Sequence, residues 1–459
     1  MTQSLVWIRR TLRLTENKVI AKALENSEKI KLCFVFDPEI LNYFPNKQDR
    51  RLSFIVNHLE QINQDLGRHN ASIQILFGKP EEQIPNFASN NGFTQVFCDA
   101  DFEPSSKTRD EKVAKALGNL NIKFHQVLDH LLMHPSSIKK QDGTAYKVFT
   151  PFMKHFRSLI NAQILQAPIY ALEERLVPGL NNFDKINILQ KAAYEYRDDP
   201  LWHPLKAYST FANFLENKIV VYHENRNLLY GNNTSTISPY LRFGALSITD
   251  CFARSLDKEV HPSFVNELIW REFYAYIMYW FPDSIGSEFQ VKYRGTIKWQ
   301  FDENLLHKFK KGLTGFPVVD AAVRQLLETG WMHNRARMIV ASFFTKNLFF
   351  DWRIGEEFFS QYLMDYDLAS NACGWQWTAS VGTDAQPYFR VFNPVAQGIN
   401  FDPNGEYVKQ FVPELRDVNI SDIHDPESLK KYHGIKYNAP IVDYKTSRKY
   451  AIETFRQIT

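Results

Sequence analysis

The segment from Asp365 to Trp377, DYDLASNACGWQW, carries the residues of this chain that are best suited to chemistry. Two acids stand two residues apart, Asn371 follows, and two tryptophans, again two residues apart, end the run. A tryptophan is large and flat, and its N–H needs a partner when it is buried. Such rings among polar groups indicate a site that holds a flat aromatic cofactor and moves electrons. Taken alone, the segment is also compatible with a tryptophan-rich turn in a core.

A second candidate segment, TSTISPY at 234–240, is rich in hydroxyl groups. Ser238 before Pro239 predicts an N-cap with proline at the first helical position. Hydroxyls, backbone N–H groups and the helix dipole together can bind phosphate at such a terminus. A well-capped helix without any ligand explains the same pattern.

Two further segments combine aromatic, amide and charged residues. In ELIWREFY at 267–274, Glu267, Trp270 and Arg271 share one helical face, which suits contacts with a base edge, a base face and a phosphate. An amphipathic helix with a Glu–Arg pair is the alternative.

In GWMHNRARM at 330–338, Asn334 and Met338 are one helical turn apart, and Arg335 and Arg337 point to different faces. One arginine suits a phosphate and the other an internal acid. Two exposed arginines on a solvated helix are the alternative. Downstream, Arg390 and Gln397 add donors beside aromatic residues, which suits contacts with a single strand or a flipped base.

Two kinds of domain are predicted to position these residues. Short β-rich runs alternate with helical patterns in the first part, and the predicted strands are 5–8, 30–36, 73–77, 95–98 and 122–127. The alternation predicts an α/β domain with a doubly wound parallel sheet over residues 1–127. Ligands of such sheets bind at the carboxyl ends of the strands. Neither standard glycine-rich phosphate loop occurs in the sequence.

The rest of the chain is less regular at first and then helical. Residues 128–200 mix turn signals with short helical patterns, and we expect an interdomain connection that runs over the surface. From 201 to 459 no strand alternation is sustained, and helices are predicted at 264–280, 318–329, 336–347 and 356–362. This part is therefore expected to be an all-α domain.

The composition narrows the class of protein. Of 459 residues, 44% are hydrophobic and 23% charged, as in an ordinary globular protein, and the net charge of +3 is too small to prove a nucleic-acid partner. The four cysteines form no C-x-x-C pair, so no metal site or dithiol motif is predicted, and they fit a reducing cytosol. No signal peptide and no apolar run of membrane-spanning length is found, so we expect a cytoplasmic protein.

In their order along the chain, five motifs resemble the photolyase/cryptochrome family: TSTISP, ELIWREF, GFPVVDAAVRQL, GWMHNRARM and NACGWQW. The resemblance covers essentially the whole chain and is greatest to class I cyclobutane pyrimidine dimer photolyases. It implies an α/β N-terminal domain and a helical C-terminal domain that binds one FAD. It also implies a reaction. Reduced FAD, excited by blue light, passes an electron to a pyrimidine dimer flipped out of UV-damaged DNA, the dimer splits, and the electron returns.

The resemblance implies which residues bind the FAD: Tyr222, Thr234, Ser235, Thr236, Ile237, Ser238, Arg337, Asp365, Tyr366, Asp367 and Asn371. Tyr222 and the hydroxyls of 234, 235 and 238 are implied to lie near the phosphates, and Arg337 to pair with Asp365. Asn371 is implied to face N5 of the flavin, where its amide can both donate and accept.

The resemblance also implies residues for the lesion, the DNA and the electron supply. Asn371 is counted as catalytic together with five residues of the dimer pocket, Glu267, Trp270, Asn334, Met338 and Trp377. Glu267, Trp270 and Asn334 also count as DNA contacts, and the residues implied to hold the backbone are Arg226, Arg271, Arg335, Arg390 and Gln397. Electron transfer between flavin and surface is implied for Trp375, Trp352 and Trp299.

The same motifs separate the branches of the family. Asn334 and Met338 occupy the motif in which family members that repair (6-4) photoproducts have histidines. Asn371 occupies the position at which plant-type cryptochromes have Asp and animal-type cryptochromes have Cys. Trp377 keeps the second tryptophan of W-Q-W, which the single-strand-preferring branch usually replaces by Tyr. A blue-light receptor without repair activity is the alternative function, and a generic flavin electron carrier is a third. We expect a monomer whose partner is UV-damaged DNA.

Two positions depart from the family pattern. Ala372-Cys373 replaces the common Asn-Gly, and Ser105-Ser106 replaces the Asn-Glu pair of folate-binding members. The run Asp101-Phe102-Glu103-Pro104 instead resembles the type that binds a deazaflavin as a second, light-harvesting chromophore. Folate, a second flavin and an empty antenna pocket remain alternatives.

Overall fold

The computed structural model describes residues 2–44, 46–180, 182–257 and 261–458. It divides into two compact units. The first comprises Met1–Ala145, Met153–Ile219 and Ser235–Trp280, and the second Tyr146–Phe152, Val220–Thr234 and Phe281–Thr459. The unit boundaries interleave along the chain, so the division at residues 127 and 200 stays a prediction.

The first unit is built on a parallel sheet with the strand order β3-β2-β1-β4-β5. The strands are β1 Gln3–Trp7, β2 Lys29–Phe36, β3 Gln74–Phe77, β4 Gln95–Asp99 and β5 Lys123–Val127. The order reverses next to β1, which pairs with both β2 and β4. All five predicted strands and the parallel, doubly wound arrangement are confirmed.

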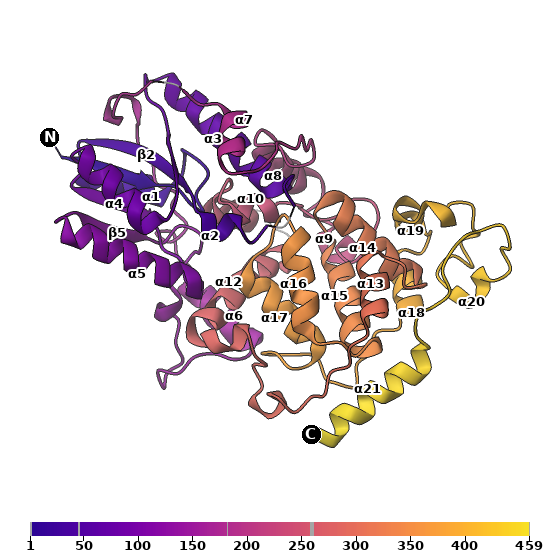
Figure 1. Cartoon of the computed structure of the whole chain (residues 1–459). Coiled ribbons are helices and arrows are strands. Elements are labelled where there is room, and N and C mark those ends of the chain that lie inside the picture. The colour runs from indigo at the N-terminus through magenta and orange to yellow at the C-terminus, as the bar shows by residue number, and fades with distance from the viewer. Residues whose placement is uncertain (1, 45, 181, 258–260, 459) are drawn as a thin grey trace. The chain divides into compact units, whose positions relative to one another are not determined.

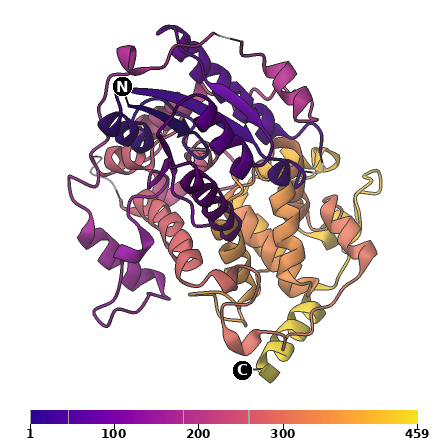
Figure 2. The ribbon, with the colours of Figure 1, turned by 60° about the vertical axis from the view of Figure 1, so that its left-hand side comes forward.

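Two clusters of apolar side chains cover the two faces of this sheet, as the period of a strand requires. Val6 and Ile8 pack with α1 Lys18–Asn26 and α3 Arg50–Gly67 on one face. Leu5 and Trp7 pack with α4 Pro80–Asn90 and α5 Pro104–Asn119 on the other. The strands and these helices are the indigo to purple elements of Figure 1, and Figure 2 shows them from another side.

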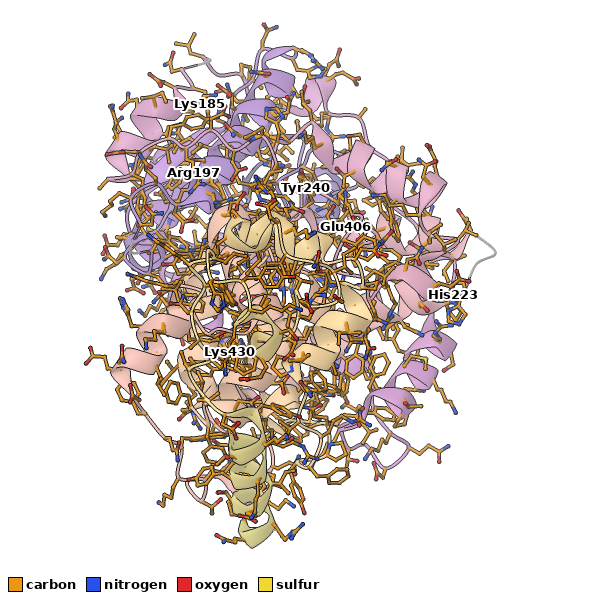
Figure 3. The ribbon with its side chains drawn as sticks, turned by 90° about the vertical axis from the view of Figure 1, so that its right-hand side faces the viewer. Lys185, Arg197, His223, Tyr240, Glu406 and Lys430 are labelled. Carbon is orange, nitrogen blue, oxygen red and sulfur yellow. The ribbon has the colours of Figure 1, made fainter. Side chains whose placement is uncertain are left out.

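The remaining helices of the first unit are α2 Pro38–Leu41, α7 Lys185–Lys191, α8 Lys206–Asn217, α10 Ser238–Arg242, α11 Ile248–Leu256 and α12 Ser263–Trp280. Tyr240 of α10, labelled in Figure 3, is buried and donates its hydroxyl to the carbonyl of His203 at 3.1 Å. Helix α6 Phe149–Leu159 belongs partly to each unit. The expectation that 128–200 runs over the surface is wrong in part, because Leu131, Phe152 and Phe156 are buried.

The second unit is helical, with no strand among its described residues. Its principal helices are α13 Glu303–Lys310, α14 Pro317–Thr329, α15 Asn334–Ser342, α16 Trp352–Tyr362, α17 Leu368–Ala379, α18 Pro394–Phe401, α19 Glu406–Phe411 and α21 Tyr444–Ile458. Shorter ones are α9 Tyr222–Asn225 and α20 Pro426–Leu429. One continuous apolar cluster holds the long helices together.

The helix predicted over 336–347 changes type within its length. Helix α15 ends at Ser342 and passes directly into a π-helix, η5 Phe343–Asn347. The wider turn accompanies a buried lysine, Lys346, whose Nζ donates to the carbonyl of Ala379 and to the Ser380 hydroxyl at 3.0 Å each. Burial lowers the pKa of this amine well below its ordinary value.

Candidate functional site

Helix α17 positions Asn371 through its own cap and through α16. The Asp367 side chain begins the helix by accepting the N–H of Ser370 at 3.0 Å. One turn later, Nδ2 of Asn371 donates to the carbonyl oxygen of Glu356 at 3.1 Å and to its Oε1 at 2.9 Å. Both partners accept hydrogen bonds, so the amide nitrogen faces α16. Its Oδ1 is used by no hydrogen bond among the described residues.

Glu356, which the motifs did not indicate, links two of the predicted residues. Its Oε1 also accepts the hydroxyl of Tyr366 at 3.1 Å. Burial raises the pKa of Glu356, against the two hydrogen bonds that lower it. No local pattern marks this residue, because its partners lie 10 and 15 positions further along the chain.

Arg337 is paired with an acid. Its Nη2 lies 3.0 and 2.8 Å from the two oxygens of Asp365, and its Nε donates to the carbonyl of Met332 at 2.9 Å. The predicted pairing with Asp365 is confirmed. A role of the two residues in binding a flavin stays a prediction.

Arg335, two residues earlier, has only neutral partners in the described contacts. Its Nη2 donates to Oδ1 of Asn227 at 2.8 Å, and its guanidinium lies 4.4 Å from the centre of the Phe401 ring. Burial, and then the nearby positive charge of Arg226, lower the pKa of Arg335, although an arginine stays charged in a protein. Two like charges held near each other indicate a place for an anion such as a phosphate.

The start of α15 sets the position of Asn334 and Met338. His333 caps this helix, since its Nδ1 accepts the N–H of Arg335 at 3.0 Å. Burial lowers the pKa of His333 to about 4, so the ring is neutral and able to accept. Asn334 is exposed, and its Nδ2 lies 3.9 Å from the sulfur of Met338. The one-turn contact that the spacing predicts is therefore present.

The three tryptophans of the predicted electron chain belong to the apolar cluster of the second unit or pack against it. Trp375 and Trp352 are 2% and 1% exposed, whereas Trp299 is half-buried and lies 5.1 Å from the Phe349 ring. Gly355 of α16 makes room for the indole of Trp375, because a Cβ there would lie 2.3 Å from the ring. Of the three tryptophans, Trp375 and Trp352 are therefore buried and Trp299 is partly exposed.

The W-Q-W motif has three different environments. Trp375 is buried, and Trp377, on another face of α17, is half-buried. Gln376 between them is buried and holds the chain near 284–289, donating to the carbonyl of Ser284 at 2.6 Å and accepting the N–H of Phe289 at 2.9 Å. The middle residue therefore positions another segment.

In the first unit, α12 carries Glu267, Trp270 and Arg271, all half-buried. The Trp270 ring packs within its own helix, with ring centres 5.7 Å from Phe273 and 5.4 Å from Tyr274. Nη1 of Arg271 donates to the carbonyl of His130 at 2.8 Å and lies 3.5 Å from the buried carboxylate of Glu272. The charge of Arg271 is thus partly compensated, unlike that of Arg335.

The hydroxyl-rich segment folds differently from the prediction. Ile237, not Ser238, occupies the cap position of α10, and it makes no side-chain cap hydrogen bond. The reason lies one residue earlier, where Thr236 has φ +51° and reverses the chain, so that Ser238 already has a helical position. The Thr236 hydroxyl donates to the carbonyl of Ser235 at 2.8 Å. Because α10 has five residues, its dipole is short, and a phosphate here would depend on hydroxyls and backbone N–H groups.

The remaining predicted residues of the second unit lie at different depths. Tyr222 is buried, Thr234 and Arg226 are half-buried, and Arg390 is exposed. Gln397 of α18 has a buried Oε1 that no described residue hydrogen-bonds. Such an atom is costly without a partner and marks a place for a ligand donor.

The segment that resembles a deazaflavin-binding motif is engaged in the first unit itself. Asp101 pairs with Arg10 at 3.2 Å and accepts the hydroxyl of Ser106 at 3.1 Å. Glu103 lies 3.5 Å from Arg10 and 3.2 Å from Arg242. The carboxylates of this motif therefore have partners already.

The sequence matches the family model for DNA photolyase over residues 4–169 and that for the FAD binding domain of DNA photolyase over residues 264–457. Two relatives named deoxyribodipyrimidine photo-lyase, from Alkalihalophilus pseudofirmus and Escherichia coli, are 34% and 33% identical to it. Each alignment covers 98% of this chain and 97% of the relative. The chain belongs to the DNA photolyase family.

Solved structures of photolyases have the same fold. A class III photolyase from Agrobacterium tumefaciens is 28% identical with a TM-score of 0.87, covering 100% of this chain and 98% of its own. A photolyase from Sulfolobus tokodaii with two FAD molecules is 29% identical with a TM-score of 0.85, covering 99% and 100%. The predicted family, the two-part fold and the FAD-binding domain are confirmed. No helix in the described parts of this photolyase-family protein has the length and apolar character needed to cross a membrane.

Proposed function

We propose that this protein is a light-driven repair enzyme that splits cyclobutane pyrimidine dimers in UV-damaged DNA. The observation that supports it most is the combination, in the second unit, of an acceptor oriented by α16 with an arginine that has no acidic partner in the described part of the chain. Among the described residues, Asn371 has only Oδ1 free of a hydrogen bond, and the guanidinium of Arg335 has two neutral partners, Asn227 and Phe401. The first suits a reduced flavin and the second a DNA phosphate.

FAD supplies the light-absorbing electron donor of this reaction when it is bound. The polar groups available to it fit this role. Oδ1 of Asn371 can accept a hydrogen bond from the protonated N5 of a reduced flavin, and the pair Arg337–Asp365 offers a donor and an acceptor of fixed geometry. Tyr222 and residues Thr234 to Ser238 would hold the phosphates.

Recognition of the dimer is assigned to Glu267, Trp270, Asn334, Met338 and Trp377. Asn334 presents its amide at the exposed start of α15, with Met338 one turn below. Glu267 and Trp270 lie on one face of α12, where a carboxylate can accept from a base edge and an indole can cover a base face. Arg226, Arg271, Arg335, Arg390 and Gln397 would hold the backbone beside the lesion.

The test is repair of an irradiated oligonucleotide by the FAD-loaded, chemically reduced protein under blue light, followed by chromatography. We expect thymine dimers to be converted to thymines in the light and not in the dark, and (6-4) photoproducts to remain. Glu267→Ala should reduce repair roughly 5- to 150-fold, as for a lost hydrogen bond of 1–3 kcal/mol. Its FAD content should equal that of the wild type.

No light-dependent recovery of thymine by the wild-type protein would favour a blue-light receptor. A receptor needs no dimer pocket, so Glu267→Ala would then leave its light response unchanged.

Three finer features belong to the same proposal. The protein acts as a monomer in the cytoplasm. A second chromophore of deazaflavin type is preferred to folate because of Asp101-Phe102-Glu103-Pro104, and the relative from Sulfolobus tokodaii with two FAD molecules keeps a second flavin as an alternative. The absorption spectrum of the material released on denaturation distinguishes deazaflavin, folate and flavin.

A further inference from the structure

Trp352, the middle tryptophan of the proposed electron chain, donates its indole N–H to a carboxylate. Nε1 lies 3.4 Å from Oε1 of Glu288, and Glu288 is 3% exposed. Trp375 differs from it, because its buried Nε1 has no hydrogen-bond partner among the described residues. The two indoles therefore offer different environments to a positive charge.

The position of Glu288 is fixed from two sides. Its other oxygen, Oε2, lies 2.9 Å from Nη2 of Arg353, whose Nη1 contacts both oxygens of Asp351 at 2.9 Å each. Nε of Arg353 donates to the carbonyl of Gly286 at 2.9 Å. On the other side, the side chain of Gln376 binds backbone groups of Ser284 and Phe289. Oε1 of Glu288 is thus held toward the indole while Oε2 is satisfied elsewhere.

The charges around Trp352 favour its oxidised form. The guanidinium of Arg353 lies 4.9 Å from the centre of the Trp352 ring and opposes a positive charge there. Two carboxylates, Glu288 and Asp351, pair with this single guanidinium, so the group carries a net negative charge. Glu288 is buried, so its charge acts more strongly than in water, whereas the side chains of Arg353 and Asp351 are partly exposed.

We propose that Glu288 is the proton acceptor of Trp352 when light drives electrons toward the flavin, an inference that rests on the proposed function. Bound FAD, excited by light, would be the oxidant. Trp375 would lose an electron to it and then take one from Trp352. Oxidation makes the indole N–H far more acidic than in the neutral ring, and its Nε1 proton moves to Oε1 of Glu288. A neutral indole radical and a neutral carboxylic acid result.

The cycle closes through the outer tryptophan. An electron from Trp299 reduces the Trp352 radical, the proton returns from Glu288 to Nε1, and an external thiol reduces Trp299. Until then the transferred proton keeps the vacancy at Trp352, because the electron that Trp375 took from Trp352 can return only if the indole of Trp352 is protonated again. Trp375 cannot be trapped in this way, since no acceptor among the described residues faces its N–H. Glu288 thereby gives the chain its direction.

The test uses FAD-loaded protein in the Trp299→Phe background, in which the vacancy stops at Trp352. After a light flash, absorption bands distinguish the neutral from the cation radical of tryptophan. We expect the neutral radical in Trp299→Phe and a persistent cation radical after adding Glu288→Gln, which keeps the shape and removes the base. In the otherwise wild-type chain, Glu288→Gln should lower the yield of stable flavin reduction roughly tenfold. Glu414→Gln, which breaks the 2.7 Å pair with Arg324 in the same unit, is the matched control and should change neither signal.

Identical radical spectra with and without Glu288→Gln would overturn the inference. A second measurement needs no change at Glu288: in Trp299→Phe the rate of deprotonation should be independent of buffer concentration, because the acceptor belongs to the protein. A rate proportional to buffer concentration would overturn the inference equally. So would the absence of light-driven flavin reduction in the wild type, whereas the repair assay with chemically reduced protein would still decide the proposed function.

Discussion

The buried arginines at the carboxyl edge of the parallel sheet pair with acids, whereas Arg335 of α15 has only neutral partners among the described residues. At the sheet, Arg9 holds Asp110 through two hydrogen bonds of 2.6 and 3.0 Å, and Arg13 holds Asp129 at 2.5 Å. In the helical unit, Trp375 has a buried N–H without a described acceptor, and Arg335 has neutral partners. Residue types alone do not mark a site, because the same types build both regions. What distinguishes the helical region is the positive charge of Arg335, which has no acid among its described partners and is therefore available to an anionic ligand.

The largest effect that separates the helical unit from the sheet is expected in the proposed electron chain of the helical unit. Trp299→Phe removes the partly exposed end of the chain, so stable light-driven reduction of the flavin should fall to the background level. Repair by chemically reduced protein should stay nearly unchanged, because in the proposed reaction the repair electron comes from the flavin itself. Flavin absorbance under illumination with a thiol measures the first effect, and thymine release measures the second. A loss of repair as steep as the loss of photoreduction would contradict the assignment.

The buried ion pairs at the edge of the sheet are expected to contribute to the free energy of unfolding. Asp110→Asn leaves the guanidinium of Arg9 buried without its charged partner, and breaking such a pair costs about 3–5 kcal/mol. Denaturant unfolding should report this loss, monitored by circular dichroism of the FAD-loaded protein. Lys22→Gln, which breaks the exposed pair with Glu25 in the same unit, is the control and should cost about 0–1 kcal/mol. Equal losses in the two variants would mean that the network at the sheet edge is not structural.

Much of the fold could be predicted from the sequence, because periodicity is a local signal. The strands at 30–36 and 95–98 were recognisable from β-branched and aromatic runs, and α12 and α14 from apolar residues at helical spacing. The order of the strands depends on pairings between residues such as Val6 and Phe97, which no local pattern records. The cap predicted at Ser238 was wrong because the positive φ of Thr236 was not foreseeable from its residue type.

In the candidate site, the contacts that could be predicted are those between residues of recognised motifs, and the contacts that could not are those with distant partners outside the motifs. The pairing of Arg337 with Asp365 came from the family resemblance, since 28 residues separate the two. Glu356 and Glu288 could not be found, because each is an ordinary glutamate until Asn371 or Trp352 is folded against it. Gln376 stood inside a recognised motif, yet its role in holding residues 284–289 depends on a contact across 92 positions.

Two substitutions distinguish the proposed phosphate contact of Arg335 from the proposed stacking contact of Trp270. Arg335→Ala should weaken binding to damaged and undamaged duplex alike and reduce its dependence on salt, because a phosphate contact releases counterions. Trp270→Ala should weaken mainly the binding of damaged DNA, by about 1–3 kcal/mol for a lost stacking surface. Titrations of both duplexes at two salt concentrations measure these effects. Equal losses on both duplexes for Trp270→Ala would argue against a flipped-base pocket at α12.

The smallest expected effect concerns Glu272 of the first unit, a buried carboxyl whose pKa is raised by folding. Glu272 accepts the N–H of Leu132 at 3.2 Å, and burial raises its pKa to about 7 although the nearby Arg271 lowers it. A carboxyl whose pKa is raised by folding stabilises the protein while it is protonated, and this contribution is lost as the pH rises toward 7 and above. The free energy of unfolding of the wild-type protein should therefore fall by about 1–2 kcal/mol between pH 5.5 and pH 8.5. The Glu272→Gln variant should not show this loss, because its side chain does not ionise. Denaturant unfolding at the two pH values measures the difference. If the stability of the two proteins changed equally with pH, folding would not raise the pKa of Glu272.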